Sequence, residues 1–494
     1  MYEVIHKSKI SFIEDLIKSG KILSARKEIA KINFKKLSRI DKVQLANLSR
    51  RAGDVLRSLR ILKPTIDNKD ITPTNHEITA YAAGLISIGA DQEGISLIRP
   101  LVKNLQSDAL LHYSLFLIKQ WNYKSASFYL KKYILTQKSS IYNQLIGRIN
   151  LISCYIVLNE LDKAEALICK CKKVASKKSF NFALIQLYRL QTQVYLQRKE
   201  FSLAYAEIRQ IVVSDKIETI SDLISAKWLA VIQLYEKPND TNSKKEIYRI
   251  KEKAIELRSW ETVRDCDFHL ATTTKDLDLL VKLYQGASSV FFKKKILHEL
   301  DLELRAHLQI RLSEPSSATE ILLNCKENSL VYQLVQILST DLYRSFPIGE
   351  IFSKIHQEEK FNALSSVDRI KRLIQRAKHC IRSSNISIDI KIIGNQCKLI
   401  SPNQQFIVFK PKSLNIESER VFTEKDILAD LRKTFKAKTC TNAKIRSHLN
   451  ISKSQTRLLL IKYLKTGIIK KVGSKFDGTY IFNNNRNDYS NRKP

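Results

Sequence analysis

Apolar residues recur at helical spacing from the N-terminus to about residue 325, in segments of roughly 10–18 residues separated by short polar breaks. Only 12 glycines and 9 prolines occur in the 494 residues, so the chain is poor in the residues that tight turns of an all-β protein require. The pattern predicts a mainly α-helical protein.

Within this region, the second helix of each expected pair carries a small residue at a similar place. The steps between these positions are 33, 36, 32, 38 and 40 residues, and the positions are Ala25, Ser58, Gly94, Ala126, Ala164 and Ala204. A small residue is expected where two antiparallel helices pass close together. Larger residues that follow it fill the groove against the next pair.

A period near 34 residues resembles the tetratricopeptide repeat (TPR), and the resemblance covers about residues 10–215. The Trp, Gly and Pro positions of the full repeat consensus are largely missing, so the region is TPR-like. The resemblance implies an α-solenoid over residues 1–325, whose concave surface binds a protein or peptide partner or serves self-association as a homodimer. The alternative is that the solenoid is a spacer.

Residues 418–483 change their hydrophobic period partway along. Helical spacing gives way to two β-like runs around a turn of Gly, Lys and Asp residues, with expected helices at 423–435, 441–450 and 452–467 and expected strands at 468–472 and 479–482. Gly467 is placed to cap the last helix. Helix, helix, tight turn, helix and hairpin is the order of a winged helix-turn-helix, and this stretch resembles that family.

In that family the third helix lies in the major groove of DNA and its N-terminal half reads bases. By position, the resemblance implies that the DNA-contacting residues of the helix are Lys453, Ser454, Gln455, Arg457 and Lys462, and that those of the wing are Lys470, Lys471 and Lys475. Gln can bond adenine, Arg can bond guanine, and wing lysines can touch phosphates. Leu458, on the same side, is expected either to contact a thymine methyl group or to bury against another domain.

A second copy of this order precedes it at residues 326–412. The expected elements are helices at 329–346, 347–357 and 365–384, followed by a hairpin around Gly394 and Asn395. The order resembles the OmpR/PhoB-type winged helix, which sits beside TPR-like repeats in some bacterial activators. The resemblance implies that the third helix reads DNA with Arg369, Arg372, Gln375 and Arg376. The alternative is that this basic face is only a solvated helix surface.

The formal net charge of +35 is concentrated toward the C-terminus. Residues 365–494 hold 28 Lys and Arg against 9 Asp and Glu, whereas the first 364 residues hold 56 against 40. A lysine-rich composition alone does not gather charge at one end. The asymmetry therefore favours a polyanionic partner, most often nucleic acid.

Motifs for other functions are missing from the sequence. It contains no phosphate-binding Gly-rich loop, no GxSxG and no HExxH, so we expect no enzymatic activity. The eight cysteines are scattered without paired CxxC motifs, so we expect reduced thiols, no metal and no cofactor. Neither a signal peptide nor a long apolar segment is present, so we expect no membrane association. The tail at 484–494 is expected to be disordered.

These observations favour a bacterial, sequence-specific DNA-binding transcription regulator that is cytoplasmic and associated with the nucleoid. Double-stranded DNA is the expected partner of the two winged-helix-like regions. The alternative is a scaffold subunit resembling the PCI type, in which a winged helix after helical repeats is a surface for protein assembly. Binding of structured RNA is a third possibility that the charge permits.

Overall fold

The computed structural model describes residues 2–136, 140–211, 217–313, 319–323, 325–384, 388–400, 407–411, 428, 431–432, 434–435, 439–449, 453–472 and 479–482. The chain forms two compact units, Met1–Lys412 and Ser413–Pro494. It is mainly helical and carries small antiparallel sheets in its C-terminal part, as the sequence predicts at this level. Residues 326–412, which the sequence analysis treats as a separate domain, belong to the first compact unit.

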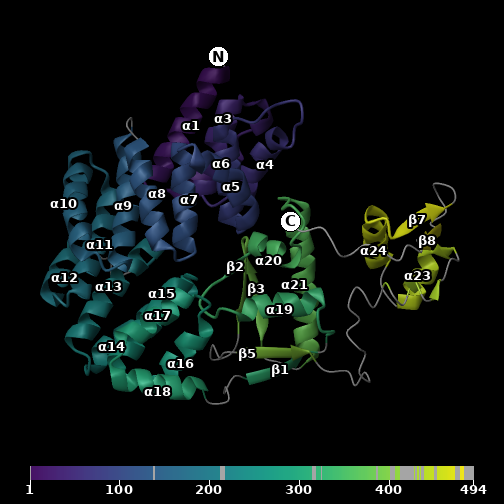
Figure 1. Ribbon diagram of the computed structural model, residues 1–494. Helices are drawn as coiled ribbons and strands as arrows, with labels where there is room; N and C mark the ends of the chain where they lie inside the picture. The colour runs from purple at the N-terminus through teal and green to yellow at the C-terminus, as the bar shows by residue number, and fades with distance from the viewer. Residues whose placement is uncertain are drawn as a thin grey trace. The chain divides into compact units, whose positions relative to one another are not determined.

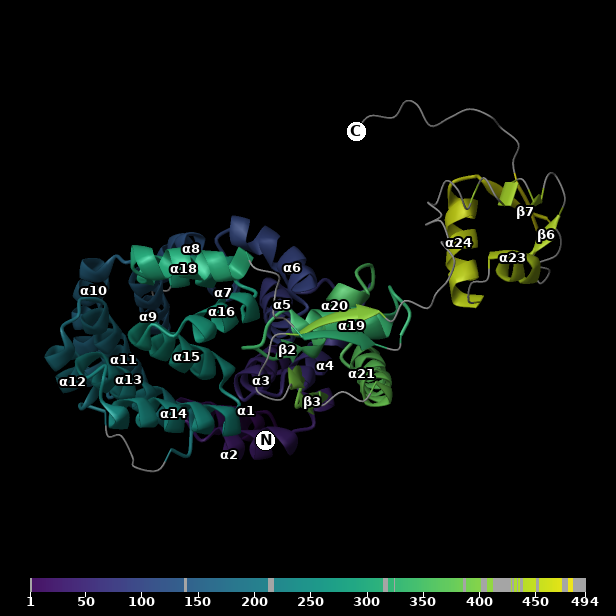
Figure 2. The ribbon, with the colours of Figure 1, turned by 90° about the horizontal axis from the view of Figure 1, so that it is seen from below.

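The first unit begins with a long run of helices, most of which pack against the next helix in the chain (Figure 1). In chain order they are α1 (Tyr2–Lys18), α2 (Ile22–Ala30), the 3-10 helix η1 (Phe34–Lys36), α3 (Arg39–Arg51), α4 (Val55–Ile66), α5 (Asn75–Ile88), α6 (Asp91–Lys103), α7 (Ser107–Lys119), α8 (Tyr123–Thr136), α9 (Ile141–Val157), α10 (Leu161–Lys177), α11 (Asn181–Gln197), α12 (Phe201–Ile208), α13 (Ile220–Glu236), α14 (Thr241–Glu256), α15 (Trp260–Thr274), α16 (Leu277–Gly286), α17 (Val290–Glu299) and α18 (Leu302–Ser313). Figures 1 and 2 show that they follow an arc, and that α15 and α16 return toward α5 and α7.

The predicted small residues mark one repeated position in this arc. Each is buried and is the fourth residue of the second helix in its pair, namely Ala25, Ser58, Gly94, Ala126, Ala164 and Ala204. The close approach is tightest at Gly94, where an added Cβ would lie 2.8 Å from Cγ1 of Ile86 and 2.9 Å from the carbonyl oxygen of Ala82. The spacing read from the sequence is thus confirmed as the spacing of helix pairs.

A second repeated feature was not predicted from the sequence. Two residues before each of these second helices, the backbone turns through the left-handed region, at Gly20, Gly53, Gly89, Trp121, Asn159 and Lys199. Glycine adopts this conformation freely, whereas other residues adopt it at a cost. The last three turns therefore keep the geometry of the repeat without its favoured residue.

Contacts cross the inside of the arc as well as running along it. The ring of Trp121, in the α7–α8 turn, lies 5.7 Å from the ring of Phe291 and 6.1 Å from that of Phe292, both in α17. The guanidinium group of Arg264, in α15, lies 5.1 Å from the centre of the Trp121 ring. Part of the surface that an open solenoid would offer to a partner is therefore covered by the chain itself.

A small α+β region follows the helices in the same unit. It consists of α19 (Leu330–Ser339), β2 (Phe346–Pro347), α20 (Ile348–Ile355), α21 (Ser365–Ser383), β3 (Asp389–Ile393) and β4 (Gln396–Ile400). Its antiparallel sheet has the order β2-β4-β3. A separate parallel pair, β1 (Thr319–Leu323) and β5 (Ile407–Pro411), flanks it in sequence. We call residues 330–400 the first module.

The first predicted helix of this module is shorter than expected: α19 ends at Ser339 instead of continuing to residue 346. The segment after it is held by the preceding helices. Asp341 accepts hydrogen bonds from the backbone N–H and the hydroxyl of Ser288, and the N–H of Leu342 donates to the carbonyl of Gly286. Tertiary hydrogen bonds thus replace the last turn that the apolar pattern predicted.

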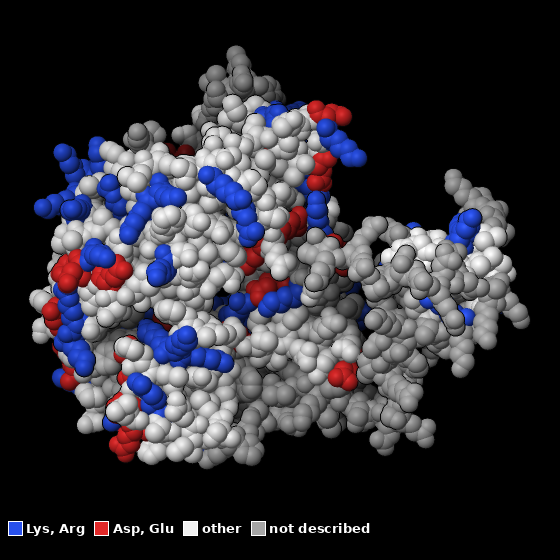
Figure 3. All heavy atoms as spheres, in the orientation of Figure 1, with Lys and Arg blue, Asp and Glu red and all other residues white. Residues whose placement is uncertain are grey.

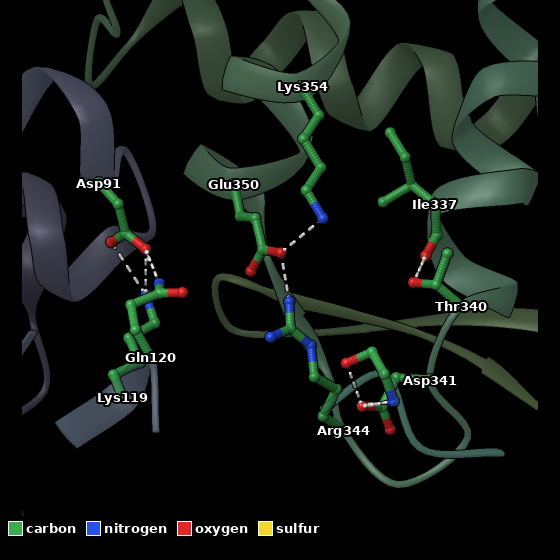
Figure 4. Close-up of polar contacts among 10 residues, drawn as sticks. Asp91, Lys119, Gln120, Ile337, Thr340, Asp341, Arg344, Glu350 and Lys354 are labelled. Atoms are coloured by element: carbon green, nitrogen blue, oxygen red, sulfur yellow. Dashed lines mark hydrogen bonds and ion pairs between the residues drawn. The ribbon is translucent and has the colours of Figure 1, made fainter. Parts of the chain in front are cut away.

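The first module also packs against the beginning of the arc. An added Cβ at Gly349, in α20, would lie 2.6 Å from the carbonyl oxygen of Ile88 at the end of α5. Figure 4 shows Arg344 and Lys354 pointing at the same carboxylate, that of Glu350 in α20. One hydrophobic core joins residues of α1 to α5 with residues of the module. The module therefore lies between the two ends of the arc and is fixed to both.

The second unit is a small α+β region with its own core. The described elements are β6 (Cys440–Thr441), α23 (Asn442–Leu449), α24 (Lys453–Lys465), β7 (Ile469–Val472) and β8 (Thr479–Phe482). Its antiparallel sheet has the order β6-β8-β7. The core contains Leu431, Cys440, Ile445, Leu460, Tyr463, Ile469, Tyr480 and Phe482. Most of the helix expected at 423–435 lies outside the described residues. We call residues 440–482 the second module.

Candidate nucleic-acid interface

The two modules share one topology. In each, a two-residue strand leads directly into a helix, a second helix follows, and a hairpin ends the module. The short first strand pairs antiparallel with the last hairpin strand, with Phe346 opposite Cys397 in the first module and Cys440 opposite Tyr480 in the second. The resemblance between the two copies that the sequence suggested is therefore present in strand order and pairing.

Helix α21 of the first module is strongly amphipathic. Its predicted apolar stripe is buried in full: Val367, Ile370, Leu373, Ile374, Ala377 and Ile381. The opposite face carries exposed Arg372, Gln375 and Arg376. Because apolar residues three and four apart fall on one side of a helix, burying that side places the basic residues in solvent. Sequence reasoning located both faces correctly.

Arg369, the remaining residue predicted to contact DNA from this helix, is only partly exposed and is paired with other side chains. Its guanidinium group forms two hydrogen bonds to the carboxylate of Glu359, one of them 3.0 Å long. It also lies 3.1 Å from Nδ1 of His356 and 5.4 Å from the centre of the Phe352 ring. Arg369 is therefore held in place and its charge is balanced by Glu359.

His356 and Glu359 were not found from the sequence. They lie 13 and 10 residues before Arg369, in the segment between α20 and α21, and no regular spacing links them to it. Burial, and then the positive charge of Arg369, lower the pKa of His356 below its ordinary value of 6.5. The imidazole is accordingly neutral near pH 7 and adds no charge to this face.

A hollow of about 540 Å³ opens on this face. It is bounded by the start of α19, the residue after α20 and the outer side of α21, and its lining residues are Leu330, His356, Arg369, Arg372, Leu373, Gln375 and Arg376. All four predicted contact residues of the first module thus meet at one place. We call it the α21 hollow.

In the second module the face of α24 is mixed. Thr456, Leu460 and Tyr463 are buried, and Arg457 and Lys462 are exposed on the other side. The main chain of Lys453, Ser454 and Gln455 lies in the first turn of α24, and the positions of their side chains are outside what the structure describes. Lys470 and Lys471 are exposed on β7, and Lys475 lies outside the described residues.

Three large apolar side chains share the outer side of α24. Leu458 is 68% exposed, Ile461 is 40% exposed and Leu464 is 37% exposed. Leu458, which the sequence analysis put on the side assigned to DNA, is thus exposed to solvent. A contiguous exposed apolar patch rimmed by polar residues is typical of a surface that contacts another molecule.

The helix ends as the sequence predicts. Gly467 has a φ of +69°, and the N–H of Ile468 donates to the carbonyl of Tyr463. This is the pattern of a left-handed glycine cap, which satisfies carbonyl groups at a helix C-terminus. The cap ends α24 and leads the chain into β7. The exposed Lys470 and Lys471 of β7 therefore come a few residues after the helix that carries Arg457 and Lys462.

The charge on the helical part of the first unit is distributed differently. On the face drawn in Figure 3, Lys and Arg side chains are spread over this part and lie among Asp and Glu. Many are paired across neighbouring helices, such as Lys172 with Glu207 and Arg198 with Glu165. The helices of the arc thus neutralise much of their own charge locally.

The described residues form neither a metal site nor a membrane-spanning helix. The eight cysteines are free thiols, and nowhere in the described ranges do three His, Cys, Asp or Glu side chains gather as a metal ion would require. Within the same ranges, no helix has the length and apolar character needed to cross a bilayer.

Comparison with known protein families finds no family that matches this chain, and comparison with curated proteins finds no significant match.

Proposed function

We propose that this chain is a sequence-specific DNA-binding transcription regulator whose two modules are winged helices. The observation that supports this most strongly is the repeated topology, in which α21 and α24 each follow a short helix, precede the hairpin and expose basic residues. In a winged helix the helix at this position reads DNA. Arg372 and Arg376 on α21 and Arg457 and Lys462 on α24 are the described side chains suited to contact DNA. In this proposal the protein is associated with the nucleoid, and its helical arc receives a protein or peptide signal or forms a homodimer.

Binding to DNA is tested first by the salt dependence of affinity. Neutralising several phosphates releases counterions, so affinity should fall by orders of magnitude between about 50 and 200 mM salt. Fluorescence anisotropy of a labelled duplex with the full-length chain measures this directly. An affinity that does not change with salt contradicts the proposal.

Sequence specificity is tested by recovering the DNA bound to the tagged protein in cells. Sharp peaks that share a motif, and that disappear in an Arg457→Ala/Lys462→Ala version, support a regulator. Flat recovery for both proteins contradicts it. The operator sequence and the genes beside the peaks follow from the same experiment.

A second candidate function is favoured by one specific observation, the exposed Leu458, Ile461 and Leu464 on α24. An apolar helix face suits protein assembly, as in a scaffold subunit with a terminal winged helix. In that case the full-length protein binds no duplex at low salt. Leu458→Gln/Ile461→Gln then releases a co-purifying protein, whereas Arg457→Ala/Lys462→Ala does not.

A further inference from the structure

The α21 hollow contains positive charge that the described part of the chain does not balance. Arg372 and Arg376 lie one helical turn apart on the same side of α21, and both line the hollow. Among the residues that the structure describes, no acidic side chain is paired with either. Like charges four residues apart on a helix repel each other and destabilise the helix. Such a pair gains from an anion that bridges it.

The third arginine of the hollow serves a different purpose. Glu359 and His356 hold the Arg369 side chain, and its charge is balanced by the Glu359 carboxylate. It shapes one wall and leaves the positive potential to Arg372 and Arg376. Arg369 is therefore a positioning residue in this site.

The remaining lining gives the hollow an apolar and a neutral polar part. Leu330, at the first turn of α19, is 39% exposed, and Leu373 is buried beneath the hollow. Gln375 offers an amide that can both donate and accept hydrogen bonds. A volume of about 540 Å³ falls within the roughly 300–1,000 Å³ of sites that hold small organic ligands. The hollow therefore has room for more than a bare phosphate ion.

We propose that the α21 hollow binds a nucleotide unit. Arg372 and Arg376 hold its phosphate, and the sugar or base lies over Leu330 and Leu373 with Gln375 at its edge. Guanidinium groups suit this role because they donate paired hydrogen bonds to phosphate oxygens. Two sources can supply the unit: the backbone of duplex DNA, in which case this inference rests on the proposed function, or a free nucleotide.

The experiment compares these two sources in the full-length chain. Fluorescence anisotropy is measured with a labelled duplex and, separately, with a fluorescent adenine nucleotide. The test variant is Arg372→Gln/Arg376→Gln. The matched control is Lys371→Gln/Arg382→Gln, which removes the same charge from exposed positions of the same helix that do not line the hollow. All four substituted side chains are exposed, and thermal unfolding checks that both proteins remain folded.

If DNA supplies the nucleotide unit, the test variant binds the duplex about tenfold more weakly or worse, and the slope of log affinity against log salt falls by about 1, as expected for one lost phosphate contact. The control variant changes much less. If a free nucleotide is the ligand, wild type binds the fluorescent nucleotide, the test variant loses that binding, and affinity for the duplex is the same in both variants. Either result supports the hollow.

The same measurements distinguish an error in the proposed nucleotide site from an error in the proposed DNA binding. If wild type binds the duplex, does not bind the nucleotide, and both variants lose equal affinity, the hollow is overturned and DNA binding stands. If wild type binds the nucleotide through Arg372 and Arg376 but no duplex, the hollow stands and the proposed function fails. If wild type binds neither ligand, both are overturned.

Discussion

The hydroxyl of Tyr343 donates a hydrogen bond of 2.9 Å to Oδ2 of Asp267, and both side chains are buried. Tyr343 lies between α19 and β2, and Asp267 lies in α15, so the bond joins the first module to the helical arc. The other carboxylate oxygen of Asp267 lies 2.5 Å from Nζ of Lys251 in α14. Burial, and then the charge of Asp267, raise the pKa of Tyr343 well above its ordinary value. The phenol therefore remains a donor at any physiological pH.

Replacing Tyr343 by Phe removes this donor and leaves a buried carboxylate oxygen without it. We expect the free energy of unfolding to fall by about 1–3 kcal/mol, the usual cost of leaving a buried polar group unsatisfied. Urea unfolding measures this loss. Tyr248→Phe is the control because Tyr248 is 50% exposed, and surface changes of this kind are usually within about 0.5 kcal/mol. Equal stability of the two variants contradicts a structural role for the bond.

The helical arc could be predicted because its signal is local and repeated. The small residues of the pairs, from Ala25 to Ala204, are spaced regularly and are all buried. The curvature could not be predicted, since it depends on contacts such as that of Trp121 with Phe292, 171 positions later in the chain. The predicted end of α19, at residue 346, was wrong for the same reason. Its end is set by Ser288 and Gly286, which no local pattern near Ser339 reveals.

The candidate site was predictable where it follows a helical face. The apolar stripe of α21 fixes the outer position of Arg372 and Arg376. The neutralisation of Arg369 was not predictable, because Glu359 belongs to an irregular segment whose path is set by the fold. A sequence shows which residues share a helix face, but not which of them find a partner from elsewhere.

Lys398 gives the first unit a pH-dependent stability. It is 6% exposed in β4, its ammonium group lies 3.9 Å from the centre of the Trp260 ring, and it donates to the carbonyl of Leu342. Burial lowers its pKa from 10.5 to about 8. The unfolded chain therefore binds more protons than the folded chain between these two values, so stability should rise with pH in this window.

The measurement is the free energy of unfolding in urea from pH 7.5 to 9.5, for wild type and Lys398→Met. Wild type should gain about 2 kcal/mol relative to the variant between pH 8 and 9.5, since one pKa unit corresponds to about 1.36 kcal/mol. Only the slope is diagnostic, because methionine also loses the contact with Trp260. If the free energy of unfolding depends on pH in the same way in the two proteins, the pKa of Lys398 is not lowered by burial.

Lys199 tests the left-handed turn of the repeat. Its φ is +62° and its side chain is exposed, so Lys199→Gly relieves backbone strain without removing a packed group. We expect a gain of about 0.5–1 kcal/mol, the difference between the strain and the entropy that glycine loses on folding. Lys199→Ala removes the same side chain but keeps the strain, and it should not stabilise. A rise in melting temperature with both substitutions would assign the effect to the side chain instead.

Gly349 tests the contact between the first module and the start of the arc. A Cβ at this position would lie 2.6 Å from the carbonyl oxygen of Ile88 and 3.0 Å from the backbone nitrogen of Ala90. Because the backbone atoms cannot move aside easily, Gly349→Ala should destabilise the first unit by about 1–3 kcal/mol, as other overpacked sites do. Ser353→Ala, one turn later in α20, is the control for helix propensity. A neutral effect of Gly349→Ala in thermal unfolding would show that α20 is not held against α5.

Arg457 and Leu458 are adjacent, both exposed on α24, and chemically opposed, so they separate the two candidate functions of the second module. If α24 reads DNA, Arg457→Ala should cost about 1–3 kcal/mol at the preferred sequence and little on random DNA, because a bidentate contact to guanine is specific. Equal losses on both sequences would make Arg457 a phosphate contact.

If α24 reads DNA, Leu458→Ala should reduce discrimination of thymine from uracil in the duplex, since only thymine carries the methyl group that leucine contacts. If α24 instead binds a protein, Leu458→Ala weakens that complex more than Arg457→Ala does, and neither changes affinity for DNA.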